Sequence, residues 1–167
     1  PPVGNVKLKL RLPKTRVGQF LLCAFLAVVL FMVMMRVRAA ISIPGELGVT
    51  EMKLAPCPDT PNCVSTQTDQ VDKLLSPIPY TGSEESALNR ITQILQQMPR
   101  TKIAKEKHNY VHAECRSFLF RFVDDVEFLI DDTEKLIHFR SAAPVGYSDL
   151  EVNRKRMEEF TRKFGES

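Results

Sequence analysis

Residues 17–35 read VGQFLLCAFLAVVLFMVMM and hold no charged side chain, although Arg16 precedes them and Arg36 follows them. Nineteen residues that rise about 1.5 Å each form a helix of about 28 Å, close to the hydrocarbon thickness of a bilayer. A buried core helix would show a polar stripe, and the stretch has none. A secretory signal would end at a cleavage site, which the nearby Arg36 and Arg38 disfavour. The sequence therefore predicts one transmembrane helix over residues 17–38. The side chains expected to contact lipid or a partner subunit are Phe20, Phe25, Phe31 and Met35.

Charge is distributed unevenly along the chain. Residues 1–38 hold seven of the 23 lysines and arginines and no acid, so the remainder has 16 basic residues against 20 acidic ones. Five of those seven cations precede the apolar stretch. By the positive-inside rule, the N-terminus then faces the cytoplasm, stroma or matrix, and the C-terminal domain faces the opposite side. A basic isoelectric point of this origin favours contact with lipid headgroups and argues against nucleic-acid binding.

Two segments flank the predicted helix. Residues 1–16 alternate apolar and basic side chains before Pro13, which favours an extended arm along headgroups or a neighbouring subunit over a flexible tail. Because the first residue is proline and not methionine, we expect that either a targeting peptide or the initiator methionine has been removed. On the other side, residues 39–53 contain Pro44 and two glycines and are predicted to be a linker.

Residues 54–65, LAPCPDTPNCVS, contain three prolines and are predicted to form a stiff loop. We favour a disulfide between Cys57 and Cys63, which requires their Cα atoms to approach within about 7 Å and which the compartment opposite the N-terminus would permit. Reduced structural cysteines, or a metal or redox site, are the alternatives. A zinc site would need two further ligands, and redox pairs are more often spaced Cys-x-x-Cys. Cys23 and Cys115 are expected to be apolar fillers rather than reactive thiols.

The rest of the chain predicts an α+β domain over residues 54–165. Ser83 caps a helix with apolar side chains at helical spacing, and Pro99 ends it. In residues 101–142, apolar and polar side chains alternate as they do in β-strands. Residues 118–124 are compatible with either a strand or a helical turn. We expect an antiparallel sheet of three to five strands flanked by two helices, in addition to the N-terminal transmembrane helix.

The last helix is predicted from two signals. Ser148 and Glu151 have the spacing of a capping box at its start, and Gly165 is a stop signal at its end. Its predicted apolar stripe consists of Leu150, Met157, Phe160 and Phe164.

Four motifs in order carry a family resemblance. They are PCPxxPNCVS at 56–65, FRFVDDVEF at 120–128, RSA at 140–142 and GYSDLxxNR at 146–154. Together they resemble the domain-of-unknown-function family fourteen-ninety-nine, which occurs in bacteria, cyanobacteria, algae and plants, over about residues 54–164. The resemblance implies a small α+β fold and no particular reaction. Where the family usually has Ser-Arg after the RSA motif, this chain has Ala143 and Pro144, which weakens any proposal of an anion-binding cation there.

No catalytic residue, metal or cofactor is predicted. The chain lacks a nucleophile elbow, a phosphate loop and a Cys-x-x-Cys pair. His108 and His112 fall in a segment of period two, which disfavours a helical metal pair. Polar residues near the motifs either bind a ligand or, in the favoured interpretation, form a buried network that fixes the last helix on the sheet. These candidates are Asp124, Asp125, Glu127, Arg140, Ser141, Tyr147, Asp149, Asn153 and Arg154.

The favoured function is a non-catalytic accessory subunit of an organellar membrane complex, with other subunits and lipids as partners. An assembly factor, a respiratory-complex subunit and a ligand-binding or enzymatic domain are the alternatives. The family's occurrence in photosynthetic organisms favours a thylakoid membrane and a photosynthetic electron-transfer complex, with the domain in the lumen. A mitochondrial inner membrane, with the domain in the intermembrane space, is the second choice. Pigment contact by the helix is compatible with this hypothesis but is not predicted.

Overall fold

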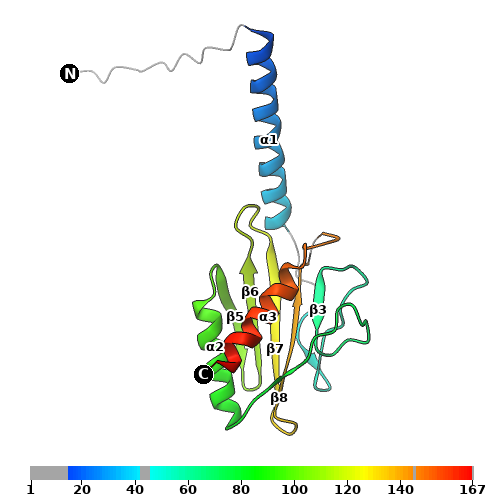
Figure 1. The fold of residues 1–167 in the computed structure, drawn as a ribbon, viewed down its shortest axis with the longest axis vertical. Coiled ribbons are helices and arrows are strands. Elements are labelled where there is room, and N and C mark those ends of the chain that lie inside the picture. Colours follow the sequence, from blue (N-terminus) through cyan, green and yellow to red (C-terminus); the bar gives the residue numbers. More distant parts are fainter. Residues whose placement is uncertain (1–14, 42–45, 145, 167) are drawn as a thin grey trace, which may run out of the picture.

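The computed structural model describes residues 15–41, 46–144 and 146–166, so the predicted arm lies outside the described residues except at its end. Helix α1 (Arg16–Ala40) begins after Thr15, whose hydroxyl accepts a hydrogen bond from the Gly18 amide. Figure 1 shows α1 projecting from one end of the domain. The helix is long and apolar enough to span a membrane, and Ala39 is its one buried residue.

The domain is built on a six-stranded antiparallel sheet with the order β3-β8-β7-β6-β5, in which β4 also pairs with β8. A separate small hairpin, β1 and β2, precedes it. The strands are β1 (Val49–Thr50), β2 (Lys53–Leu54), β3 (Cys63–Ser65), β4 (Ile78–Pro79), β5 (Thr101–Lys107), β6 (Tyr110–Arg116), β7 (Val123–Asp131) and β8 (Leu136–Ala142).

Helices α2 (Glu84–Gln97) and α3 (Val152–Gly165) cover one face of this sheet, as Figure 1 shows. The Ser83 side chain caps α2 as predicted, by accepting from the Ser86 amide. The main core lies between these helices and the strands, and the tilted rings of Phe128 and Phe160 pack there with centroids 4.4 Å apart. We call this side of the sheet the helical face.

The opposite face is covered by the chain that follows α1, and we call it the covered face. Leu54 of β2 packs against Tyr110 and Leu129 of the sheet, and Cys57 and Cys63 pack against Ala142. Because both faces are covered, the whole centre of β7 is buried, including Glu127. A strand buried on both faces is more typical of parallel sheets than of antiparallel ones.

These elements confirm the α+β class. The sheet has one strand more than the predicted upper limit, because β3 and β4 lie in segments that were expected to be loops and pair with β8. Part of the predicted linker also belongs to the domain, since residues 49–54 form the small hairpin. The ambiguous segment 118–124 forms a turn that ends where β7 begins at Val123.

The predicted start of the last helix is wrong. Leu150 and Glu151 both adopt positive φ angles, so helical geometry begins only at Val152 and no capping box forms. Asp149 does the capping instead, because its carboxylate accepts from the Asn153 amide at 2.7 Å. Leu150 therefore falls outside the helix and is 81% exposed, whereas the remaining three residues of its predicted stripe are buried as expected.

Strand β5 forms one edge of the sheet, with lysines at 102, 105 and 107. Its pairing with β6 is interrupted between Ile103 and Lys105, where the register shifts. Most of the strand is at least partly exposed, so its outer backbone groups lie near the surface.

We expect Phe160→Ala to lower the free energy of unfolding by about 3–5 kcal/mol, because it removes a fully buried ring between α3 and the sheet. Urea denaturation of the full chain in detergent, followed by circular dichroism, measures this. The control is Val71→Ala at an 85% exposed side chain, which should change stability by less than about 0.5 kcal/mol. Equal losses from the two substitutions would contradict the described core.

Candidate functional site

The sheet divides the predicted polar residues into separate groups. Asp124 and Asp125 are adjacent on β7, so their side chains point to opposite faces. On the helical face, Asp124 pairs with Arg156 of α3 at 2.6 Å. On the covered face, Asp125 pairs with His112 of β6 at 2.8 Å. The two carboxylates therefore serve different partners and do not form an acid–base pair.

Glu127 is the centre of the group on the covered face. Its side chain is fully buried and accepts three hydrogen bonds, from the Arg140 guanidinium at 3.0 Å, the Tyr110 hydroxyl at 2.7 Å and the Gly48 amide at 2.7 Å. Burial and the neighbouring Glu127 carboxylate raise the pKa of Tyr110, which keeps this phenol protonated as a donor. A buried carboxylate with this many donors satisfies the condition under which a charge can be buried.

Arg140 has a buried donor without a partner among the described residues. Its Nη1 binds Glu127, while its buried Nε makes no hydrogen bond. Arg140 and Asp125 line a cavity of about 510 Å³ that lies beside the cysteine-containing loop and is also bordered by Asn62. Here two buried charges of the predicted cluster border a space large enough for a small molecule.

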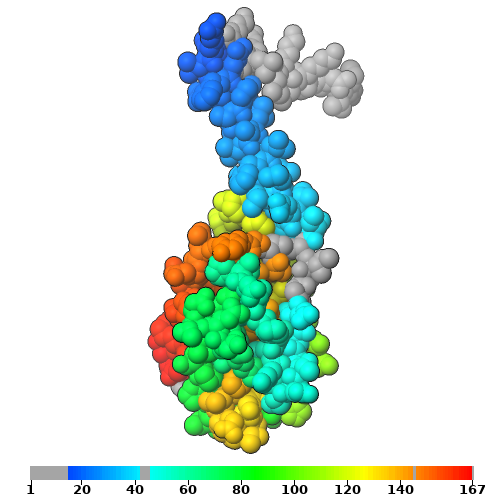
Figure 2. All heavy atoms as spheres, turned by 90° about the vertical axis from the view of Figure 1, so that its right-hand side faces the viewer, coloured from blue at the N-terminus to red at the C-terminus, as the bar shows by residue number. Residues whose placement is uncertain are grey.

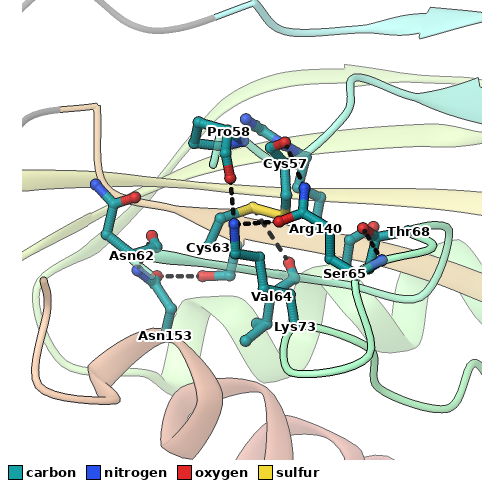
Figure 3. Close-up of a disulfide and its surroundings, with 12 residues drawn as sticks. Cys57, Pro58, Asn62, Cys63, Val64, Ser65, Thr68, Lys73, Arg140 and Asn153 are labelled. Atoms are coloured by element: carbon teal, nitrogen blue, oxygen red, sulfur yellow. Dashed lines mark hydrogen bonds between the residues drawn. A yellow bond between two sulfur atoms is a disulfide. The ribbon is translucent and has the colours of Figure 1, made fainter. Parts of the chain in front are cut away.

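The cysteine-containing loop is closed by a disulfide between Cys57 and Cys63, with Cα atoms 5.7 Å apart, so the favoured alternative is confirmed (Figure 3). Asn62 donates from its side chain to the carbonyls of Ala143 and Gly146, which fixes the loop to the chain after β8. The loop is therefore held both covalently and by hydrogen bonds.

Lys73 also holds this loop through a hydrogen bond, which the sequence did not indicate. This side chain is 3% exposed and donates to the Pro58 carbonyl and to the Gln70 side chain, which Figure 3 shows beside the disulfide. A lysine within a polar, proline-rich segment gives no signal that distinguishes it from a solvated surface residue.

A second network joins β7, β8 and α3 on the helical face. The Ser141 hydroxyl donates to the Asn153 side-chain oxygen at 2.5 Å, and Arg156 donates to that same oxygen and to Asp124. Burial raises the pKa of Asp124, against the opposing effect of the Arg156 charge. Asn153 also donates to the Asn62 carbonyl at 3.1 Å, so α3 is tied to the cysteine-containing loop as well.

The remaining candidates lie outside both networks. Tyr147 is 75% exposed, and Asp149 caps α3. Arg154 donates to the Asp72 carbonyl at 2.5 Å. Thus Arg140, Tyr147, Asp149, Asn153 and Arg154 do not converge on a single site.

The histidines and free cysteines offer no alternative centre. His108 contacts Glu84 at the surface, and His112 is held by Asp125. Within the described ranges, no three histidine, cysteine or acidic side chains are grouped so that they could hold a metal ion. Cys115 is a core residue, and burial raises the pKa of its thiol, which disfavours the reactive thiolate.

The predicted contacts of α1 differ in their surroundings. Phe20 and Phe25 are exposed and Met35 is half-buried. Phe31 packs edge-on against Phe120 of the domain, with ring centroids 6.1 Å apart. Most of the helix surface therefore has no partner among the described residues.

One family matches the chain. Residues 53–164 match the family described as "Protein of unknown function (DUF1499)", which is the family that the four motifs resemble. Comparison with curated proteins gives no match, and comparison with solved structures gives none either.

We expect Arg140→Ala to lower the free energy of unfolding by about 3–5 kcal/mol, because it leaves the fully buried Glu127 carboxylate without its cation. Denaturant unfolding at neutral pH measures the loss. Lys155→Ala is the control: Lys155 forms an exposed pair with Glu151 at 3.9 Å, and its loss should cost less than about 0.5 kcal/mol. A stable Arg140→Ala protein would refute a structural role for this ion pair.

His138 generates a prediction about pH. Burial lowers the pKa of His138 below its ordinary value of 6.5, so the unfolded chain binds this proton more readily than the folded chain does. The corresponding stability is present above pH 6.5 and is lost as the pH falls through the lower folded-state value. His138→Gln should therefore flatten the fall in unfolding midpoint on mild acidification. Val71→Ala, at an exposed side chain that does not titrate, should leave that slope as it is; equal slopes in all three proteins would contradict the prediction.

Proposed function

The chain belongs to the DUF1499 family of proteins of unknown function, and from this premise we propose that it is a single-pass, membrane-anchored accessory subunit of a larger membrane protein complex. In this role the domain contacts and stabilises neighbouring subunits and performs no reaction. The proposal rests chiefly on α1, whose apolar side chains need a lipid or protein environment.

The exposure of α1 supports an anchor. Its most apolar stretch has no residue buried by the rest of the chain, unlike the core helix of a soluble domain. Phe20, Phe25 and Leu30 are all well exposed on it. In water, such a surface would drive association, whereas a bilayer or neighbouring transmembrane helices would cover it.

The internal pairing of the polar groups supports a structural role for the domain. Glu127, Asp125 and Asp124 each have a positively charged or hydrogen-bonding partner within the chain. Both networks connect segments far apart in the sequence, and this is how a buried polar network specifies one packing arrangement.

Orientation and location extend the proposal. The cations before α1 favour an N-terminus in the stroma, matrix or cytoplasm, with the domain across the membrane. The disulfide supports an oxidising compartment on the domain side. We favour the thylakoid membrane with the domain in the lumen, because of the family's occurrence in photosynthetic organisms. The alternative is a mitochondrial inner membrane with the domain in the intermembrane space.

A second candidate function is small-ligand binding at the cavity beside the disulfide. The unpaired Arg140 Nε and the adjacent Asp125 are the observations that favour it. In that case, Asp125→Asn should remove ligand binding while the melting temperature stays close to that of the original chain. A large fall in melting temperature from this substitution would favour the structural role instead.

The accessory-subunit proposal predicts stable co-migration with a complex. Native membranes should be solubilised in mild detergent and separated by size, and the chain should appear with other subunits in equal amounts. Photo-crosslinkers are introduced at Phe25 in α1 and, as the control, at Glu134 in the β7–β8 turn. They identify which of these two parts of the chain contacts the other subunits. We expect crosslinks to other subunits from position 25.

Two outcomes would count against this proposal. Recovery only as a free monomer would refute it. Recovery in small amounts with incomplete complexes would assign the chain to assembly instead.

A further inference from the structure

Exposed apolar side chains gather at the end of the domain nearest α1. Phe118 is 78% exposed, and Leu119 is also exposed beside it in the connection between β6 and β7. Tyr147 and Leu150 are exposed in the connection between β8 and α3, which lies at the same end in Figure 1. We call residues 117–122 the tip loop.

The tip loop contacts the apolar part of α1, and Figure 2 shows the surfaces of the two segments side by side. Phe120 packs on Phe31, and the Leu119 carbonyl accepts from Arg36 at 3.4 Å. Phe31 lies five residues before Arg36, so the two residues are about 7.5 Å apart along the helix axis, and Arg36 is the first cation after the apolar stretch. A bilayer that covers residues 17–35 would therefore reach the level of the tip loop.

The tip loop is held in shape rather than free to fold back. The Ser117 amide donates to the Phe122 carbonyl at 2.8 Å, and the Phe122 amide donates to the Ser117 hydroxyl at 3.0 Å. The rings of Phe120 and Phe122 also contact each other, with centroids 6.0 Å apart. Phe118 and Leu119 are thus presented outward on a closed turn.

Cations surround this apolar end. The Arg100 guanidinium lies over the Phe118 ring at 5.6 Å. Arg36, Arg116 and Arg121 line a cavity of about 320 Å³ between α1 and the strands, together with the acidic Glu114 and Asp125. Aromatic and aliphatic side chains bordered by arginines match the chemistry of the bilayer interface, where apolar groups meet anionic headgroups.

We propose that the tip loop, with Tyr147 and Leu150 beside it, inserts into the headgroup region of the bilayer, so that the domain rests on the membrane surface. This inference depends on the proposed membrane anchor, because α1 sets the level of the bilayer. Lipid is favoured over a protein partner because the tip loop is continuous with the surface of α1 that faces the hydrocarbon.

Tryptophan fluorescence tests this directly, because the chain contains no tryptophan. Three single substitutions in the full chain give one probe each: Phe118→Trp in the tip loop, Phe25→Trp in α1, and Glu134→Trp in the turn at the opposite end of the domain. Each protein is reconstituted into phosphatidylcholine–phosphatidylglycerol vesicles in which lipids brominated near the headgroup or near the acyl-chain end act as quenchers. Circular dichroism confirms that each variant is folded.

We expect Phe118→Trp to show blue-shifted emission and quenching mainly by the shallow bromines, while Glu134→Trp emits as in water and is not quenched. Phe25→Trp should be quenched mainly by the deep bromines. If Phe118→Trp behaves like Glu134→Trp while Phe25→Trp is quenched, the anchor stands and the inserted tip loop is refuted. If Phe25→Trp is not quenched either, the anchor itself fails. Crosslinking of position 118 to a protein subunit in native membranes, with no quenching in vesicles, would also overturn the proposal.

Discussion

The arrangement of the domain depends on the hydrogen bonds and the ion pair that the buried Glu127 carboxylate makes. It lies in the central strand β7 and receives donors from β6, from β8 and from the segment that follows α1. A carboxylate without exposure to water must keep such partners, because an unpaired buried charge is strongly unfavourable. The Gly48 amide is therefore held on the covered face of the sheet. This hydrogen bond fixes the start of the small hairpin against the sheet.

The network on the helical face and the disulfide-closed loop form one connected support. Asn62 lies in the disulfide-closed loop, and its carbonyl accepts from Asn153 of α3, which in turn contacts Ser141 of β8. The family motifs fall on these contacts: the first contains the disulfide, the second contains Asp124, Asp125 and Glu127, and the last contains Asn153. The motifs of this domain thus occupy positions that hold its layers together. This distribution is consistent with the structural role proposed above.

Much of the fold could be predicted because its signals are local. The apolar stretch, the Ser83 cap and the alternating strands each depend on neighbouring residues. The covered face could not be predicted, because alternation in β7 suggests one solvated side, whereas distant residues 46–63 bury that side. Arg156 and Lys73 were missed for the same reason: a basic residue on a helix or in a polar loop is ordinarily solvated, and only tertiary contacts show otherwise. The start of α3 was misplaced because two residues adopt left-handed geometry within a plausible capping sequence.

Strand β5 ends the sheet with an open edge, and this feature bears on how copies of the protein coexist. Under the proposed anchoring, copies of the protein would share one membrane plane, where collisions between edges are more frequent than in free solution. An unpaired strand edge is a template for joining sheets from separate molecules. The lysines at 102, 105 and 107 and the irregular pairing near Ile103 make that edge repulsive and uneven. We expect these features to disfavour edge-to-edge pairing between neighbouring copies.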